Sequence, residues 1–399
     1  MTARGPLEGI RVIDLGTVIA GPFAATLLAD FGADVIKVEI PGRGDTLRQL
    51  GPIAPSGTSY WWAADARNKK SVTLDLRQSE AQALFLKLVD VSDVVVENFI
   101  PGTLAKWGLG ADVLAARNPR LVVSHASGYG QTGPYAQRPG YDRVGVAFAG
   151  LWHMTGEADR EPIRPGLSLA DYLTGTLGAL GIMMALFHRD ARGGAGQEVD
   201  AALYESVFRT MEYTVSHYSL TGEIRGRSGN AGPAVPSGAF MSADGRWLAM
   251  TVAQDAMYGR LMRAIGRDDF AEAPHYRGAP GRMADREPIE RAIRDWIGSR
   301  TAAEVERLLM AAEIPIAVEA TVADTFVDPQ FAHREVIQWV DDPALGRTAI
   351  QGVTPKLSAT PGGVHSPAPL LGQHNDEVYG GLLGLTSPEV EGLRARGVI

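Results

Sequence analysis

Short apolar runs alternate with helical patterns along the first third of the chain. Residues 9–15 (GIRVIDL) are typical of a buried strand, and a turn at Gly16 separates them from an apolar segment with helical spacing. Pro22 suits the first turn of that helix, and Gly32 suits its C-terminal end. A second strand pattern follows at once at residues 34–40 (DVIKVEI). A strand, a helix and a strand in such quick succession predict a βαβ unit with parallel strands.

The same alternation continues as far as residue 128. Strand patterns occupy residues 71–76, 93–99 and 120–128, and helical patterns occupy 79–92 and 102–117. Strands that alternate with helices in this way predict an open, doubly wound parallel sheet of the Rossmann-like α/β class.

The pattern changes near residues 222–240, which are rich in glycine and proline and are typical of a linker or a functional loop. Beyond them we expect a hairpin at 241–252 with its turn at 243–245, and then three helices. These helices are expected at 254–266, 287–298 and 302–312. The predicted organisation is a large α/β domain over 1–222, a small α+β domain over 223–320, and a segment over 321–399 that returns to the large domain.

Composition and charge narrow the class of protein. The 399 residues include 47 Gly and no Cys, and 38 Lys and Arg stand against 46 Asp and Glu, which gives a formal net charge of −8. The absence of cysteine excludes disulfides, thiolate-ligated metals and a catalytic thiol. The mildly acidic balance predicts no nucleic-acid partner. The N-terminus lacks a secretory apolar segment, and the apolar stretch Leu177–Phe187 is too short to span a bilayer, so we expect a cytoplasmic enzyme without a membrane partner.

Common catalytic and cofactor motifs are absent from the sequence. The first strand–helix turn, GTVIAGP at 16–22, matches neither the dinucleotide fingerprint nor the P-loop. No HExxH or GxSxG motif occurs, so we expect neither a bound metal nor a serine nucleophile. Chemistry by a carboxylate remains open.

Asp171 is the carboxylate with the most suggestive surroundings. It lies with Ser168 at the start of a long apolar helix, where either residue is suited to cap the N-terminus. The helix that follows contains Gly175, Gly178 and Gly181, and interior glycines weaken a helix. Such a run indicates close approach of another backbone or of a bulky ligand. A helix N-terminus also favours an ionised carboxylate, the form that a nucleophile requires.

Several collinear motifs resemble family III CoA-transferases of the CaiB/BaiF type. They are the segment from residue 9 to 39, GRGD at 42–45, RNKKSVTLDLR at 67–77, DVVVENFIPGTLAKWGLG at 93–110, SGYGQTGPYAQRPGYD at 127–142, the Asp171 segment, GAGQEVDAALYE at 194–205 and PLLGQHNDEV at 369–378. The resemblance covers essentially the whole chain. LWHMTG at 151–156 and PIRPG at 162–166 are most similar to members that use succinyl-CoA and dicarboxylic acids.

The resemblance implies a fold, a reaction and an assembly. It implies an interlocked homodimer in which the large domain contains both chain ends. It implies transfer of CoA from a donor such as succinyl-CoA to a free carboxylic acid, with Asp171 as the nucleophile that becomes an aspartyl-CoA thioester. CoA thioesters are then substrates, and no permanently bound cofactor is expected.

The resemblance also assigns residues to CoA and to the acids. The implied CoA contacts are Val18, Ala20, Leu74, Arg77, Asn98, Phe99, Lys106 and Tyr141. Lys106 stands where arginine is frequent and Ile40 where some members have a basic residue, so these phosphate contacts are expected to be weaker. Core packing is the alternative role for Val18, Leu74 and Phe99. The loop at 228–238 lies where members have a flexible glycine-rich segment, but it lacks a run of four glycines, so its role as a lid stays open. Arg164 and His153 have two alternative roles: contact with the acceptor's distal carboxylate, or that of structural or solvent-facing polar residues.

Two other functions compete with CoA transfer. An α-methylacyl-CoA racemase of the same superfamily is similar in fold but needs a histidine where this chain has Tyr141, and His125 and His153 lie elsewhere. A tyrosine with an ordinary pKa of about 10 is a poor base at neutral pH. The third possibility is a non-catalytic CoA-binding subunit, against which the retention of Asp171 and Tyr141 argues.

Overall fold

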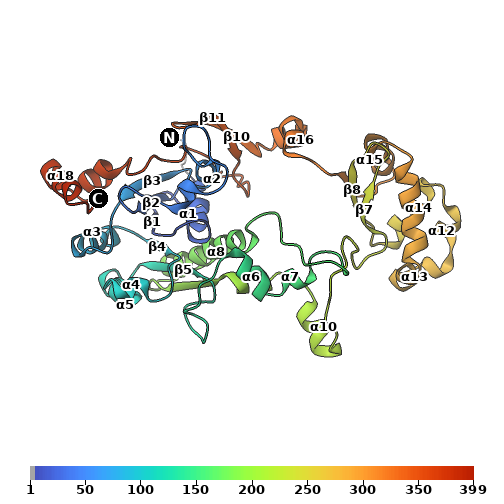
Figure 1. The fold of residues 1–399 in the computed structure, drawn as a ribbon, viewed down its shortest axis with the longest axis horizontal. Helices are drawn as coiled ribbons and strands as arrows, with labels where there is room; N and C mark the ends of the chain where they lie inside the picture. The colour runs from blue at the N-terminus through green and yellow to red at the C-terminus, as the bar shows by residue number, and fades with distance from the viewer. Residues whose placement is uncertain (1–4) are drawn as a thin grey trace. The chain divides into compact units, whose positions relative to one another are not determined.

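A six-stranded parallel sheet is the centre of the larger of two compact units. The structure is a computed structural model that describes residues 5–399. The strands are β1 (Arg11–Asp14), β2 (Asp34–Glu39), β3 (Lys69–Thr73), β4 (Val94–Glu97), β5 (Val122–Ser127) and β6 (Glu198–Ala202). Their order across the sheet is β3-β2-β1-β4-β5-β6, and every neighbouring pair is parallel (Figure 1). The predicted parallel α/β sheet is therefore confirmed.

Helices connect the strands of this unit and follow β6. They are α1 (Ala20–Asp30), η1 (Thr46–Gln49), α2 (Tyr60–Asp65), α3 (Ser79–Asp90), α4 (Thr103–Lys106), α5 (Ala111–Arg117), α6 (Asp142–Phe148), α7 (Leu151–Met154), α8 (Leu169–Ala191), α9 (Leu203–Phe208) and α10 (Thr214–Thr221). Residues 102–117, expected to be helical, divide into α4 and α5 because Gly108 adopts a left-handed conformation between them.

The two faces of the sheet bury different sets of side chains. Along the strands, Ile13, Ile36 and Val95 join one core with α3 and α5, whereas Val12 and Val94 join a second core with α1 and α8. This alternation is that of strands covered by helices on both sides. The strand order reverses between β1 and β4, and ligands of open α/β sheets bind at the carboxyl ends of strands beside such a switch point.

The sequence pattern missed strand β6. Its burial alternates between exposed and half-buried positions, as expected of an edge strand rather than of a continuous apolar run. The charged residues Glu198 and Asp200 therefore hid it from the pattern.

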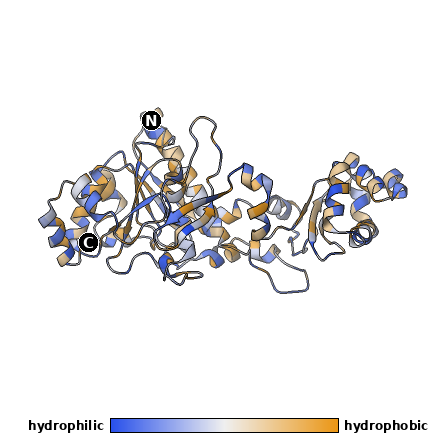
Figure 2. Cartoon of the chain, turned by 90° about the horizontal axis from the view of Figure 1, so that it is seen from above, coloured by the Kyte–Doolittle hydropathy of each residue, from blue (hydrophilic) through white to orange (hydrophobic). Residues whose placement is uncertain are grey.

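The second unit comprises residues 153–163 and 224–329. It contains the antiparallel sheet of β7 (Ser237–Met241), β8 (Trp247–Thr251) and β9 (Ile316–Val318). Its helices are α11 (Asp255–Ala264), α12 (Asp268–Glu272), η2 (Pro274–Tyr276), α13 (Ala279–Ala284), α14 (Arg286–Gly298), α15 (Ala302–Ala311) and α16 (Val322–Val327). These helices carry both apolar and polar residues (Figure 2), and the apolar sides of α11, α14 and α15 contribute to a separate core. The hairpin begins earlier than expected, because β7 precedes residue 242.

Residues 330–399 belong to the larger unit. They contain β10 (Ile337–Asp342), β11 (Gly346–Gln351), η3 (Asp376–Leu382) and α18 (Ser387–Ala395), and α17 (Pro329–His333) leads into them. Tyr379 and Val390 join the same core as α3, and Arg396 pairs with Glu80 of α3. The C-terminal segment thus completes the cover over one face of the sheet.

Helix α8 is long and apolar enough to cross a membrane by length and composition, and nearly half of its apolar window is buried. It packs against α1 and against β5 and β6. These contacts are those of a core helix of an α/β unit.

Candidate active site

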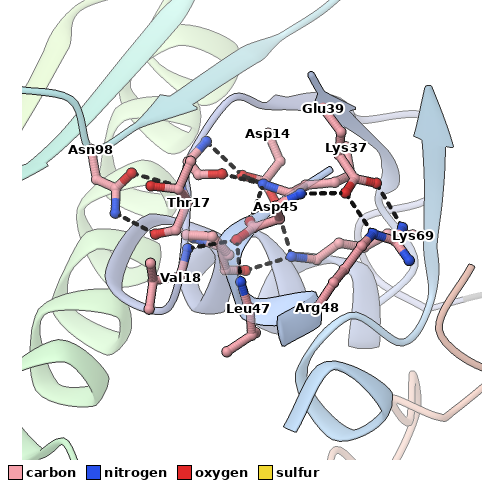
Figure 3. Close-up of polar contacts among 12 residues, drawn as sticks. Asp14, Thr17, Val18, Lys37, Glu39, Asp45, Leu47, Arg48, Lys69 and Asn98 are labelled. Atoms are coloured by element: carbon pink, nitrogen blue, oxygen red, sulfur yellow. Dashed lines mark hydrogen bonds and ion pairs between the residues drawn. The ribbon is translucent and has the colours of Figure 1, made fainter. Parts of the chain in front are cut away.

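The turn between β1 and α1 is fixed by backbone hydrogen bonds to distant side chains. Asn98, just after β4, accepts the N–H of Thr17 at 2.7 Å and donates to the Thr17 carbonyl at 2.7 Å. Asp45 accepts the N–H of Val18 at 3.0 Å. Val18 has φ +64°, a conformation that costs free energy for a β-branched residue, so these contacts hold the turn in a strained shape (Figure 3).

A network of buried charged side chains packs against this turn. Lys37 of β2 lies 2.9 Å from Asp45 and 3.7 Å from Asp14, and it donates to the carbonyl of Gly16. Lys69 of β3 pairs with the other oxygen of Asp14 at 2.9 Å (Figure 3). Because each charge has an opposite neighbour and hydrogen bonds, the group tolerates full burial.

The pKa shifts in this network follow from burial and from the neighbouring charges. Burial opposes the charge of Lys37, but Asp14, Asp45 and Glu39 outweigh it and raise the pKa of Lys37. Burial likewise opposes the charge of Asp45, but Lys37 and two backbone N–H groups lower its pKa. Burial lowers the pKa of Lys69, and Lys37 adds to that effect. The Lys37–Asp45 pair therefore remains ionised at neutral pH.

A second charge pair fixes the GRGD loop at 42–45. Arg48 of η1 contacts both carboxylate oxygens of Glu39, at 2.7 and 2.8 Å, and Glu39 also accepts the N–H of Asp45 at 2.8 Å. Ser71 donates to the same carboxylate at 2.6 Å. The bidentate geometry fixes the direction of the loop that supplies Asp45 (Figure 3).

A cavity of about 180 Å³ lies at the carboxyl ends of β1, β4 and β5 and contains Asp171. Its walls are the turn Thr17–Ala20, the segments 98–101 and 126–128, residues 138–141 and Leu203. It therefore brings together Val18, Ala20, Asn98, Phe99, Tyr141 and Asp171 of the residues predicted from the sequence. Arg138 is the one positively charged side chain among its described lining residues.

Asp171 lies in the first turn of α8, three residues after Ser168. Ser168 is at the N-cap but makes no side-chain capping bond, so neither candidate from the sequence caps the helix with its own side chain. Burial, with the nearby charge of Asp142, raises the pKa of Asp171 to about 7. Burial and this like charge oppose the effect of the helix N-terminus, which was expected to favour the ionised form of Asp171.

Both chain neighbours of Asp171 are anchored to other elements. The N–H of Ala170 donates to Asp142 Oδ1 of α6 at 2.8 Å. The hydroxyl of Tyr172 donates to Asp65 Oδ2 of α2 at 2.8 Å, and Trp61 donates to both groups. Asp171 is therefore held in place from either side while its own carboxylate is without a hydrogen bond among the described residues.

The glycines of α8 face other parts of the protein. A Cβ on Gly175 would lie 2.8 Å from the carbonyl oxygen of Ala20, and one on Gly181 would lie 2.6 Å from Val199 of β6. Close approach of another backbone, one of the two alternatives left open by the sequence, therefore applies to Gly175, whereas Gly181 faces the side chain of Val199.

The loop before α6 closes on itself at the rim of the cavity. A Cβ on Gly128 would lie 2.7 Å from the Cα of Gly140, and both residues line the cavity. Glycine at these two positions is required by the close backbone approach. Their spacing was visible in the sequence, but their contact was not.

A second cavity of about 310 Å³ shares Thr17 and Phe99 with the first. Its charged lining residues are Lys37, Glu39, Arg43, Asp45, Asp75 and Arg77, and its apolar lining includes Leu15, Ile40, Leu74 and Trp107. Leu74 and Arg77, both predicted, are therefore in this second cavity. Arg77 is exposed and pairs with Asp75 at 2.7 Å, whereas Leu74 is fully buried.

Lys106 is at the exposed end of α4 and lines neither cavity; its neighbour Trp107 lines the second. Sequence reasoning missed Lys37, Asp45, Arg138 and Asp142. Lys37 could have been found from the sequence, because a lysine within an apolar strand requires an oppositely charged partner when it is buried.

His125 lies apart from Asp171. It is buried between Glu97 and Glu198, contacting the first and lying 3.1 Å from the second. Burial opposes its charge, but these two carboxylates raise the pKa of His125. No histidine is among the described residues that line the Asp171 cavity. His153 is in the second unit.

The family model described as CoA-transferase family III matches residues 7–375. The chain belongs to this family and is a family III CoA-transferase. It is 44% identical over 395 residues to the succinyl-CoA–D-citramalate CoA-transferase of Chloroflexus aurantiacus, covering 99% of this chain and 98% of the relative.

Other relatives extend the similarity to different acids and to a solved structure. The β subunit of the succinyl-CoA–L-malate CoA-transferase of the same organism is 44% identical over 402 residues, covering 100% of this chain and 99% of the relative. The succinyl-CoA:mesaconate CoA-transferase of Haloarcula hispanica is 38% identical, covering 94% and 96%. A CaiB/BaiF family protein from Brucella suis matches with a TM-score of 0.83 and 33% identity, covering 95% of this chain and 100% of that one.

Proposed function

We propose that the protein transfers CoA from succinyl-CoA to a free dicarboxylic acid through an aspartyl-CoA thioester on Asp171. The observation that carries the proposal is the position of Asp171, a poorly solvated carboxylate without a hydrogen-bond partner among the described residues, in a cavity at the sheet's switch point. Succinyl-CoA is the donor in the names of these three relatives, which supports it as the donor here.

The chemistry exchanges bonds without a change of oxidation state. An oxygen of the ionised Asp171 attacks the thioester carbonyl; a C–O bond forms, the C–S bond breaks, and CoA leaves as the thiolate. The thiolate then attacks Cγ of Asp171, which forms the aspartyl-CoA thioester and releases the donor acid. The acceptor carboxylate repeats both steps in the opposite direction. Water must be kept from both intermediates, and the half-buried position of Asp171 in the wall of the cavity supports this.

The second cavity suits the nucleotide end of CoA. Its arginines, Arg43 and Arg77, are suited to phosphates, and Trp107 offers apolar surface to the adenine. Leu74 lines the same cavity but its side chain is buried. Because the two cavities share Thr17 and Phe99, the pantetheine arm would pass these residues to bring its thioester to Asp171. Val18, Ala20, Asn98 and Tyr141 would then contact the thioester end, and Lys106 would contact phosphate only from outside the cavity.

Arg138 supports an acid with a second carboxylate. It is the positively charged side chain among the described lining of the Asp171 cavity, and its guanidinium lies 3.6 Å from the ring centre of Tyr135. A guanidinium held against an aromatic face is well suited to pair with a carboxylate. The acids in the relatives' names (citramalate, malate and mesaconate) are dicarboxylic.

The covalent step is tested by mass spectrometry. Wild-type protein incubated with succinyl-CoA is expected to gain the mass of a CoA thioester, and hydroxylamine should convert the labelled residue, Asp171, to a hydroxamate. Asp171→Asn should lose both the label and about a thousandfold or more of the transferase rate. Asp200→Asn removes a carboxylate outside the cavity and should leave both intact. A label on another residue, or transfer by Asp171→Asn at the wild-type rate, contradicts the proposal.

The role of Arg138 is tested with two acyl-CoAs of equal chain length. Arg138→Gln should raise the KM for succinyl-CoA about tenfold or more, because one charge-assisted pair is lost, and should leave the Ki of butyryl-CoA unchanged. Arg143→Gln, on the exposed side of α6, is the matched control. Equal weakening of both acyl-CoAs would assign Arg138 to the phosphates of CoA instead.

We also infer assembly as a homodimer in the cytoplasm. Leu180, Met184 and Phe187 form an exposed apolar stripe along α8. A stripe at this spacing supports burial against a second copy of the chain.

A further inference from the structure

The negative charge of Asp142 adds to the effect of burial in raising the pKa of Asp171. Asp142 is the first residue of α6, directly after Tyr141, which lines the Asp171 cavity. Its Oδ1 accepts the N–H of Ala170, so it caps α8 from another helix at the residue before the nucleophile. Asp142 itself does not line the cavity, and it is separated from Asp171 by 29 positions in the sequence.

The N–H of Ala170 needs a hydrogen-bond acceptor, but that acceptor does not have to carry a charge. The first four N–H groups of a helix lack partners within the helix, and asparagine satisfies them about as well as aspartate does. The negative charge of Asp142 therefore does more than the hydrogen bond requires. Its further effect falls on Asp171, because two carboxylates at one helix end favour a proton on the less solvated of the two.

We propose that Asp142 is a positioning residue that fixes the first turn of α8 through the N–H of Ala170 and, by its negative charge, makes the carboxylate of Asp171 more basic. This inference rests on the proposed function of Asp171 as the nucleophile. The consequence is chemical: a carboxylate whose conjugate acid is weaker is a better nucleophile toward a thioester, provided that it is still ionised at working pH.

Other charged groups around Asp171 do not replace Asp142 in this role. The loop before α6 contributes Arg138 and Tyr141 to the cavity. Tyr172, the next residue of α8, does not line the cavity, and its hydroxyl donates to Asp65 of α2. The turn at 17–20, the segments at 98–101 and 126–128, and Leu203 contribute no titratable side chain to the described lining. Burial raises the pKa of Asp171 first, and Asp142 adds to it.

The test compares the pH dependence of kcat/KM for succinyl-CoA in four proteins. Asp142→Asn keeps the acceptor for Ala170 and removes the charge, so the acidic limb should move to lower pH by about 0.5–1 unit. Asp142→Ala should show the same movement with an additional loss that does not depend on pH. Asp200 also accepts a backbone N–H, from Gln131 at 2.8 Å, so Asp200→Asn is the matched control and should follow the wild-type curve.

Ionisations of the substrate are common to all four curves and cancel in the comparison. Coincident acidic limbs for wild type and Asp142→Asn, with the CoA adduct formed on Asp171 in both, would overturn this proposal alone. Absence of the adduct from the wild type would overturn the proposed function and this inference with it.

A second measurement is independent of activity. The difference in melting temperature between the wild type and Asp171→Asn is followed from pH 5 to pH 8, and the same difference is measured in proteins that also carry Asp142→Asn. If the charge of Asp142 acts on Asp171, the difference in melting temperature should increase less between pH 5 and pH 8 in the proteins that carry Asp142→Asn. An unchanged difference would show that Asp142 is only a cap.

Discussion

A carboxylate that must attack a thioester needs to be poorly solvated yet still able to ionise. Burial limits the solvation of Asp171 and raises its pKa to about 7, so the carboxyl can still ionise near neutral pH. Its neighbours Ala170 and Tyr172 are anchored by hydrogen bonds and hold it in place. The same burial costs stability once the group is ionised, and that cost is measurable in the folded protein without any substrate.

Replacement of Asp171 by Asn should make the protein more stable at alkaline pH. The pKa of about 7 in the folded state lies above the ordinary value of 3.8, so the folded state binds the proton more tightly. Wild-type stability therefore falls as the pH rises from about 4 to about 7 and is unaffected by this group above that range. We expect Asp171→Asn to exceed the wild type by about 1–4 kcal/mol at pH 8.

Thermal unfolding between pH 5 and pH 8 measures this difference. It should widen with pH up to about 7 and then stay constant. If the difference in stability between Asp171→Asn and the wild type did not depend on pH, ionisation of Asp171 would not destabilise the folded protein.

At the residue scale, the sequence revealed Asp171 but not its surroundings. Its place before a glycine-rich helix and the family resemblance singled it out. Asp142 was hidden because its partner N–H is on another helix, and the capping pattern describes only contacts within one helix. The same holds for Asp45, whose bond to Val18 joins two loops.

At the scale of elements, α8 is built to lie close to its neighbours. Gly175 faces the backbone of α1, while Gly178, three residues along, has only ordinary contacts with Ala24 and Ser124 at 3.7 and 3.8 Å. Both glycines are buried positions of the same helix, and they differ in the space beside them. The glycine pattern predicted close approach, but which glycine requires it depends on tertiary packing.

Alanine at these two positions should have opposite effects. Gly175→Ala would place Cβ 2.8 Å from the carbonyl of Ala20 and 3.0 Å from the ring of Phe23, and we expect a loss of about 1–3 kcal/mol. Gly178→Ala finds room and improves helix propensity, so we expect a gain of about 0.5–1 kcal/mol.

Urea unfolding of both variants measures these changes directly. Because α1 begins at the wall of the active-site cavity, Gly175→Ala should also reduce transferase activity, whereas Gly178→Ala should not. Equal effects of the two alanines would refute the assigned packing.

At the scale of the whole molecule, alternating patterns predicted the parallel sheet because each strand and helix buries residues at its own period. The pattern did not predict the edge strand β6 or the start of the hairpin in the second unit, because half-exposed strands contain few apolar residues in a row. The sequence pattern of a single chain also does not predict which of its exposed apolar surfaces would be buried against a second chain.

The exposed stripe of α8 carries the prediction about assembly. Met184 is 61% exposed, and Leu180 and Phe187 are on the same side of the helix, whereas Met310 of α15 is equally exposed without belonging to that stripe. Sedimentation of the wild-type protein should show a dimer. Met184→Glu would bury a charge in the apolar interface and should shift the protein toward monomers at micromolar concentration.

Met310→Glu adds the same charge at a site of the same exposure and should leave the dimer unchanged. This comparison separates loss of an interface from a general effect of added charge. A dimer that persists in Met184→Glu would exclude this side of α8 from the interface, and a monomeric wild type would contradict assembly itself. Because a folding defect can also reduce assembly, the monomer formed by Met184→Glu should retain wild-type far-ultraviolet circular dichroism.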